Sequence, residues 1–404
     1  MSADGRTMSY PMRSILVCLL VLSITGQAVA DHRASNSHQQ SPPSAKNRVQ
    51  AQYARQRAEI VAAYRALEKE VAEKWGSEAL VPSPTRDVTY RDNLRQRSVI
   101  DYEGGSVKVE LLIGRDKADD LPAVERRLAD AIEKTVLQSA DNRPITEIAR
   151  SPEPENSHGP ALLEGLLANQ HGAPFTEDEL RDFKAWKSRS PDMRPLTGDD
   201  GRQRVLVSTE LKMVPEHIRI RAQRFSDSVS RYARALDIPP ELIYAVIETE
   251  SAFNPKARSP VPAFGLMQLV PSTGARDAYR FLYDRDRIVK ERYLYVPDKN
   301  IELGTAYLHI LYFKKFRRIK NPESRKWATI AAYNTGADNV VRAFSGRYSK
   351  RKFASRYYWR RQALNKINKM EPESVYRHLR RHLPARETRG YIRKVRERMK
   401  KYSA

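Results

Sequence analysis

The strongest constraint on the fold lies in the second half of the chain, which from Pro215 to the C-terminus contains no run of alternating apolar and polar residues. Apolar side chains there recur three and four positions apart, which predicts an almost entirely helical region. Earlier in the chain the period is two, because Val107, Val109 and Leu111 alternate with polar residues after a Gly-Gly pair at 104–105. That pattern predicts a β-hairpin. The chain of 404 residues is therefore expected to be an α+β protein, a small α+β part followed by an all-α part.

The same periodicities place further elements in the first half of the chain. Helices are expected at 53–75, 121–138 and 176–187, and another strand at 205–208. We divide the chain into four segments: a signal peptide at 1–30, a disordered linker at 31–50, an N-terminal α+β domain at 51–204 and a helical C-terminal domain at 205–404.

The N-terminus has the three parts of a secretory signal: Arg13, a short apolar run at 15–22, and the sequence Ala-Val-Ala at 28–30. The apolar run is too short to span a membrane stably. We therefore expect export and a periplasmic location. Cleavage would remove the single cysteine, Cys18, so no intramolecular disulfide is expected. A lipid anchor on Cys18 is the alternative, although Val17 stands where such anchors normally have a small residue.

The formal net charge of +23 asks for an anionic partner or a large solvated basic surface. Nucleic acid is the usual partner of so basic a protein, and the basic stretches 377–381 and 393–401 would be the contact surface. Export argues against this partner, so we expect no nucleic-acid binding. Anionic envelope surfaces and cell-wall proteins remain as partners. Alternatively, part of the excess of basic residues only solvates long helices.

Two glutamates near the end of one predicted helix compete for a chemical role. The helix is expected to begin at Pro239–Pro240 and to end at Pro255. At about 100° per residue, Glu250 falls on the apolar stripe of this helix and Glu248 roughly 160° away. A carboxyl among aliphatic side chains has a raised pKa and can act as a general acid. We expect Glu250 to be that acid and Glu248 an exposed carboxylate; the alternative for Glu250 is a helix-end ion pair.

Later segments add polar residues to apolar surroundings. Gln268 lies in the apolar run 266–270, after a turn-rich stretch that begins at Ser259. Tyr333 and Asn334 end a helix of small residues. Each has a structural alternative to ligand binding: a hydrogen-bonded core amide for Gln268, a core ring for Tyr333 and a helix cap for Asn334.

A histidine pair in the basic C-terminal region has a spacing that can bind zinc. His378 and His382 stand four apart on a predicted helix. Arg377, Arg380 and Arg381 would repel a cation there, and the sequence offers no third ligand. We therefore expect no metal site, and we expect no cofactor.

In order along the chain, short motifs resemble the catalytic domain of the lytic transglycosylases, which is similar to goose-type lysozyme. They are Glu250-Ser251 with Phe253-Asn254-Pro255, then Ser259 with Gly265-Leu266-Met267-Gln268, then Asn300-Ile301 with Gly304, Tyr307 and Leu308, then Ala332-Tyr333-Asn334, and finally Glu387-Thr388-Arg389-Gly390-Tyr391. Upstream, Trp75-Gly76 and the stretch from Val81 through the hairpin to Glu110 resemble the N-terminal domain of the murein transglycosylase C family. The resemblance implies a lysozyme-like catalytic domain. Pro262, Val270 and Thr335 depart from the family pattern. These departures bear on the shape of the substrate-binding subsites.

The resemblance also implies a reaction, cleavage of the β-1,4 bond between MurNAc and GlcNAc in peptidoglycan by one glutamate. Glu250 would protonate the leaving oxygen and then accept the proton of the sugar's C6 hydroxyl, which forms a 1,6-anhydroMurNAc end. By position, the residues that would bind the glycan strand are Ser259, Met267, Gln268, Tyr333, Asn334 and Tyr391.

Within that set the roles differ. Tyr333 would orient Glu250 or stabilise charge, Asn334 would support a helix end, and Tyr391 would line the cleft. The N-terminal domain shows no catalytic cluster, and we expect it to position the enzyme on murein or on a partner. Two alternatives stay open: a lysozyme-like hydrolase with a second carboxylate, and a non-catalytic murein-binding protein.

Overall fold

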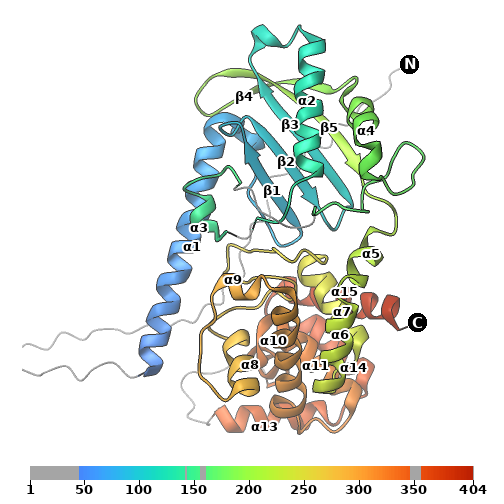
Figure 1. Ribbon diagram of the computed structural model, residues 1–404. Helices are drawn as coiled ribbons and strands as arrows, with labels where there is room; N and C mark the ends of the chain where they lie inside the picture. Colours follow the sequence, from blue (N-terminus) through green and yellow to red (C-terminus); the bar gives the residue numbers. More distant parts are fainter. Residues whose placement is uncertain (1–44, 142, 155–160, 346–355, 404) are drawn as a thin grey trace, which may run out of the picture.

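The structure is a computed structural model that describes residues 45–141, 143–154, 161–345 and 356–403 (Figure 1). The predicted signal peptide, with Cys18, and most of the predicted linker lie outside these residues. No helix in the described ranges combines the length and the apolar character that crossing a membrane requires.

The first part of the described chain mixes helices and strands, and the second part is helical. The elements of the first part are α1 (Ala45–Trp75), η1 (Gly76–Glu78), β1 (Arg86–Arg91), β2 (Gln96–Asp101), β3 (Ser106–Ile113), η2 (Arg115–Lys117), α2 (Leu121–Val136), α3 (Ile145–Ile148), η3 (Glu177–Glu179), α4 (Leu180–Ser188), β4 (Asp192–Thr197) and β5 (Gln203–Lys212). The second part consists of α5 (His217–Gln223), α6 (Ser226–Leu236), α7 (Pro240–Ser251), α8 (Gly274–Tyr283), α9 (Glu291–Leu294), α10 (Pro297–His309), η4 (Ile310–Lys315), α11 (Pro322–Thr335), α12 (Ala337–Ser345), α13 (Arg356–Ile367), α14 (Pro372–His382) and α15 (Arg386–Tyr402). The predicted α+β class is confirmed.

A five-stranded antiparallel sheet forms the upper part of the molecule in Figure 1, with strand order β1-β2-β3-β5-β4. The predicted hairpin is confirmed, because β2 and β3 pair with Asp101 opposite Ser106 around the Gly-Gly turn. The outer strands β1 and β4 were not predicted. Pro195 argues against a strand by itself, but it lies on β4 at the sheet edge, where a missing N–H is tolerated.

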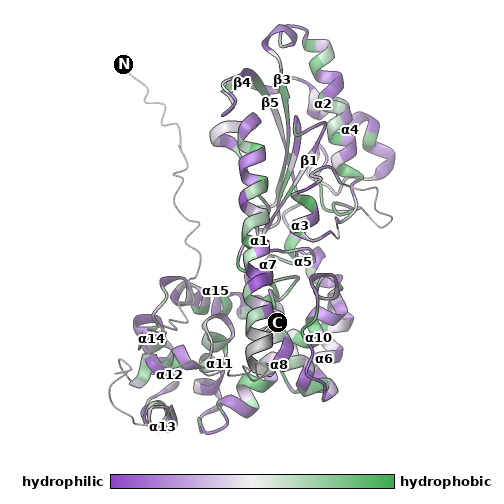
Figure 2. Cartoon of the chain, turned by 90° about the vertical axis from the view of Figure 1, so that its left-hand side faces the viewer, coloured by the Kyte–Doolittle hydropathy of each residue, from purple (hydrophilic) through white to green (hydrophobic). Residues whose placement is uncertain are grey.

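Both faces of the sheet are covered, which places it between α1 and α2 (Figure 2). On one face, Val107 and Val109 belong to an apolar cluster with Leu128 of α2. On the other face, Trp75 of α1 belongs to a second cluster with Leu206 of β5. This second cluster continues into the helical part, so the two parts of the chain share one core.

The strand β5 is longer than the stretch 205–208 that the sequence predicts. It pairs with β3 from Val205 to Lys212 and with β4 as far as Ser208. The predicted division of the chain at residue 205 therefore falls inside a strand of the sheet, and the helical part begins only after Lys212. The rest of the strand is more polar, with Glu210 and Lys212 exposed, so its full length is not evident in the sequence.

Candidate active site

The last turn of α7 carries Glu250, and α7 ends at Ser251, before the predicted end at Pro255. The chain leaves the helix through two consecutive residues with positive φ, Ala252 at 48° and Phe253 at 63°. Such conformations are unfavourable for residues with a Cβ and persist only where packing holds them. Phe253 is 1% exposed, and its ring stacks on that of Phe225, with 6.3 Å between the ring centroids.

The Glu250 side chain is partly exposed, but its carboxyl group sits in an environment that disfavours charge. Burial raises the pKa of Glu250 to about 8; the hydroxyl of Tyr391 lowers it and the negative charge of Glu387 raises it. A carboxyl group with this pKa is mostly protonated at neutral pH. The arrangement can therefore supply a proton, as a general acid must.

Two tyrosines from different helices flank Glu250. Tyr333, on α11, donates a hydrogen bond of 2.8 Å from its hydroxyl to the carbonyl oxygen of Met267. Tyr391, on α15, is buried, and its hydroxyl has no hydrogen-bond partner of standard geometry among the described residues. Burial and then the neighbouring Glu250 raise the pKa of both phenols, so both stay neutral. A buried hydroxyl beside the acid is available to hydrogen-bond it or a substrate.

The loop between α7 and α8 passes next to Glu250 and is held at several points. Asn300, on α10, accepts a hydrogen bond of 2.8 Å from the Met267 N–H and donates to the carbonyl oxygens of Phe264 and Leu294 at 2.9 and 2.8 Å. The hydroxyl of Ser251 donates to the Leu266 carbonyl at 2.8 Å, which joins this loop to α7. The backbone of the loop is thus fixed relative to the acid.

The predicted substrate-binding residues of this loop make contacts within the protein. The Gln268 amide nitrogen donates to the carbonyl oxygens of Ala257 and Gly265, both at 3.1 Å, so it holds the loop together. The Ser259 hydroxyl is partly exposed and accepts a local hydrogen bond from the Val261 N–H at 3.2 Å. The structural alternative considered for Gln268 is therefore present, and substrate contact by either residue stays a prediction.

The end of α11 is joined to α15 through Asn334. The Thr388 hydroxyl, which is fully buried, donates a hydrogen bond of 2.7 Å to the Asn334 side-chain oxygen. This contact ties the helix that carries Tyr333 to the helix that carries Tyr391. Of the predicted site residues, Tyr333 and Tyr391 thus lie near Glu250 at the end of α7.

The expectation for Glu248 was wrong. The residue is 2% exposed, because α15 covers the face of α7 that was expected to meet water. The carboxylate of Glu248 is 3.1 Å from Arg398 Nε and 2.8 Å from Lys401 Nζ, and it accepts a hydrogen bond of 2.7 Å from the Tyr402 hydroxyl. Helical geometry separated the two glutamates correctly, but it did not show that a basic helix packs against Glu248.

The sequence reasoning missed two arginines that contact this region, Arg398 and Arg221. Arg398 lies on α15 at helical spacing from Tyr391 and Val395, both of which are buried. A charged residue that continues an apolar stripe is a signal that could have identified it. Arg221 is 2% exposed in the short helix α5, where no periodicity marks it.

The His378 and His382 rings lie 4.2 Å apart, centroid to centroid. The Nε2 atom of His378 lies 2.9 Å from the Ala343 carbonyl oxygen, and its ring stacks on Phe344. No group of three or more potential metal-ligating side chains occurs within the part of the chain that the structure describes. The two histidines thus pack within the helical second part of the chain.

Two family models match the chain. Residues 53–224 match the N-terminal domain of membrane-bound lytic murein transglycosylase C, and residues 227–355 match the transglycosylase SLT domain. Membrane-bound lytic murein transglycosylase C from Histophilus somni (strain 2336) is 35% identical over 333 residues, which cover 81% of this chain and 83% of the relative. The chain belongs to the membrane-bound lytic murein transglycosylase C family. It is thus an enzyme of the lytic transglycosylase type, as the motifs predict.

A second relative and one solved structure are also similar to this chain. The protein of the same description from Actinobacillus pleuropneumoniae serotype 5b (strain L20) is 32% identical over 333 residues, covering 81% of this chain and 83% of the relative. Among solved structures, the 70 kDa soluble lytic transglycosylase from Escherichia coli is 27% identical and covers 44% of this chain and 24% of its own, with a TM-score of 0.32. The relatives in this family are named as membrane-bound.

Proposed function

We propose that Glu250 is the one residue of this lytic transglycosylase that serves as both acid and base on peptidoglycan. The observation that supports the proposal is a carboxyl group whose pKa is raised to about 8 by burial, between two neutral tyrosines. An ordinary glutamate is almost fully ionised at neutral pH and has no proton to give. Glu250 retains its proton under those conditions.

In the first step, the Glu250 carboxyl gives its proton to the glycosidic oxygen while the bond from C1 of MurNAc to that oxygen breaks. The GlcNAc hydroxyl leaves, and positive charge develops at C1 and the ring oxygen. In the second step, the Glu250 carboxylate accepts the proton of the C6 hydroxyl of MurNAc, and O6 forms a bond to C1. The product carries a 1,6-anhydro ring, no water is consumed, and Glu250 is protonated again.

The residues around Glu250 support these steps in different ways. The Tyr391 hydroxyl would stabilise the carboxylate that exists between the two steps, since it already lowers the pKa of Glu250. Tyr333 would hold the Met267 carbonyl and limit the movement of the acid. The proposed binding residues for the glycan strand are Ser259, Met267, Gln268, Tyr333, Asn334 and Tyr391. No cofactor takes part in this proposal.

The hydrolase alternative requires a second carboxylate that activates water, and one lies near Glu250. Glu387 is exposed, and its charge raises the pKa of Glu250. If Glu387 activated water, the released fragments would carry reducing ends in place of anhydro ends. The two reactions differ by one water molecule in the product.

The test is mass spectrometry of muropeptides released from purified sacculi by the wild-type enzyme, Glu250→Gln and Glu387→Gln. The proposal predicts anhydro ends from the wild type, no release by Glu250→Gln, and anhydro ends from Glu387→Gln. Binding of Glu250→Gln to sacculi should persist, because glutamine keeps the size of the side chain. Full release by Glu250→Gln would contradict the assignment, and reducing ends that depend on Glu387 would favour the hydrolase.

We propose a periplasmic location with the enzyme exported by the predicted signal peptide. The charge of +23 supports attraction to anionic envelope surfaces or cell-wall proteins in addition to the glycan strands. An outer-membrane lipid anchor at Cys18 is the alternative. Mass spectrometry of the mature protein from membrane and soluble fractions distinguishes a processed N-terminus near residue 31 from a lipid-modified Cys18.

A further inference from the structure

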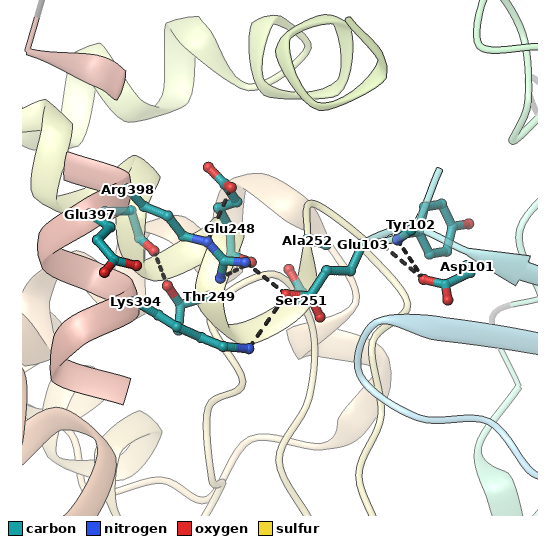
Figure 3. A network of polar contacts seen from close by, with 12 residues as sticks. Asp101, Tyr102, Glu103, Glu248, Thr249, Ser251, Ala252, Lys394, Glu397 and Arg398 are labelled. Atoms are coloured by element: carbon teal, nitrogen blue, oxygen red, sulfur yellow. Dashed lines mark hydrogen bonds and ion pairs between the residues drawn. The ribbon is translucent and has the colours of Figure 1, made fainter. Parts of the chain in front are cut away.

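The turn between β2 and β3 reaches from the sheet to the end of α7, the helix that carries Glu250. The turn is itself well fixed, because the Asp101 carboxylate accepts hydrogen bonds from the N–H groups of Glu103 and Gly104 at 3.1 and 2.8 Å. Glu103 projects from it toward α7 and α15 (Figure 3). An ordered element of the sheet therefore lies close to the catalytic helix.

Arg398 of α15 connects this turn to α7 at Glu248, two residues before Glu250. Its guanidinium lies 2.8 Å from the Glu103 carboxylate and 3.1 Å from the Glu248 carboxylate, and it also donates to the Glu248 carbonyl oxygen at 3.0 Å (Figure 3). Lys394 adds a longer ion pair to Glu103 at 3.4 Å. Side-chain exposure is 12% for Arg398 and 3% for Glu248, so this ion pair is largely shielded from solvent. Charge-assisted hydrogen bonds in such surroundings hold geometry strongly.

Arg221 of α5 connects the same turn to the end of α7 at Ala252, two residues after Glu250. It donates a hydrogen bond of 2.7 Å to the carbonyl oxygen of Ala252, the residue directly after α7, and one of 2.5 Å to the carbonyl oxygen of Tyr102. Its guanidinium also lies 5.0 Å from the centre of the Tyr102 ring. Tyr102 and Glu103 are adjacent in the turn, so the two arginines reach neighbouring points.

We propose that the β2–β3 turn positions Glu250 through Arg398 and Arg221, which hold α7 at Glu248 and at Ala252. Because the acid lies between these two anchored residues, the anchors fix both the rotation of the helix end and its distance from α15. A displacement of about 1 Å in a catalytic group can reduce a rate by about 100-fold. The N-terminal part of the chain thus contributes to catalysis without contacting the substrate's reacting atoms, and Arg398, Arg221 and Glu103 are positioning residues.

The strained backbone at the end of α7 is a physical reason for these stabilising contacts. Ala252 and Phe253 both have positive φ, which an unsupported helix end would relax. The hydrogen bond from Arg221 to the Ala252 carbonyl opposes that relaxation. The proposal rests on the catalytic role of Glu250, since a positioned residue matters only if it reacts.

The test uses the full chain and three substitutions: Glu103→Gln, Arg398→Met and the control Arg393→Met. Arg393 is also on α15 and pairs with Glu397, but both side chains are about half exposed and neither touches the turn. Glu103 is 45% exposed and Arg398 keeps its ion pair with Glu248, so Glu103→Gln leaves no buried charge without a partner and should fold normally. Rates are measured on glycan strands and corrected for the folded fraction.

The expected result is a fall in kcat of about 10- to 100-fold for Arg398→Met and about 3-fold for Glu103→Gln. KM should stay within about 2-fold, because substrate contacts are unchanged. The pH at which kcat/KM falls should also move, since the surroundings of Glu250 change, and Arg393→Met should match the wild type in every respect. A purely structural role would lower thermal stability but leave kcat per folded molecule and the pH profile unchanged, and that outcome in both Glu103→Gln and Arg398→Met overturns the proposal.

Glu250→Gln in the same assay separates this inference from the proposed function. An inactive Glu250→Gln together with unchanged kcat in Glu103→Gln and Arg398→Met supports the acid and rejects its positioning by the turn. An active Glu250→Gln rejects the acid itself. If Arg398→Met does not fold, Glu103→Gln decides the question, with Glu103→Ala as a second variant.

Discussion

The carboxyl groups of Glu248 and Glu250 belong to the same last turn of α7 and meet opposite surroundings. Glu248 is buried against Arg398 and Lys401, whose positive charges lie 3.1 and 2.8 Å from it. Glu250 has a tyrosine hydroxyl and another carboxylate near it, and burial raises its pKa to about 8. The two glutamates thus differ because the second half of α15 places basic residues against Glu248, whereas its first half places Tyr391 and Glu387 near Glu250.

The activity of the enzyme should fall as pH rises through about 8, the pKa of Glu250. The free enzyme must hold the proton to act as an acid, so kcat/KM should be high on the acidic side of this pKa and decline on its alkaline side. Initial rates on glycan strands between pH 5 and pH 10 measure this profile. An activity that rises through pH 8 would argue that Glu250 reacts first as a carboxylate.

Glu250→Gln should be more stable than the wild type in alkaline solution and equally stable in acid. The wild-type carboxyl has a pKa of about 8 in the folded state against 4.5 for the unfolded reference, so the unfolded state ionises first and folding weakens between these values. One pKa unit corresponds to about 1.4 kcal/mol, and with partial exposure we expect a gain of about 1 to 3 kcal/mol above pH 8. Urea unfolding of both proteins at pH 4 and pH 8.5 measures the difference; the same difference at both pH values would mean that the ionisation of Glu250 is not its cause.

Tyr391→Phe should raise the pKa of Glu250 and reduce kcat by about 10-fold. The hydroxyl lowers the pKa of Glu250 in the wild type, and its loss removes a group that stabilises the carboxylate between the two chemical steps. The alkaline limb of the pH profile should therefore move to higher pH while kcat falls. Tyr402→Phe is the control, because its hydroxyl hydrogen-bonds Glu248 instead; equal effects of the two substitutions would deny Tyr391 a specific role.

Gly265→Ala should destabilise the loop beside the acid by about 3 kcal/mol or more. Gly265 has φ of 74°, and an added Cβ would lie 2.3 Å from both the Asn300 amide nitrogen and the Leu294 carbonyl oxygen. Gly201→Ala is a matched control, since its φ is 72° but its Cβ would meet no atom within 4 Å. The control should lose only about 1 kcal/mol for the backbone conformation. Similar losses in thermal unfolding would show that close packing at Gly265 is unimportant.

The sequence identified the helices with clear apolar stripes, the hairpin and the helical character of the second part, because their periodicities are local. It missed β1, and it missed β4, where Pro195 lies at an edge that only the assembled sheet defines. It also placed a division inside β5, because the end of this strand is polar, with Glu210 and Lys212 exposed. The end of α7 was set too late, because Ala252 and Phe253 take unusual φ values that long-range packing supports.

From the sequence alone came a candidate acid, a glutamate on an apolar helical stripe, and a set of motifs that resembles the lytic transglycosylases. The contacts around the end of α7 depend on three-dimensional packing, because Arg221, Arg398 and Glu103 come from segments more than a hundred residues apart. Electrostatic environment depends on which charged groups meet in space, and helical periodicity describes a single helix without its neighbours. For this reason the placement of Glu248 and Glu250 on opposite faces of one helix was predictable, whereas the ion pairs of the buried Glu248 were not.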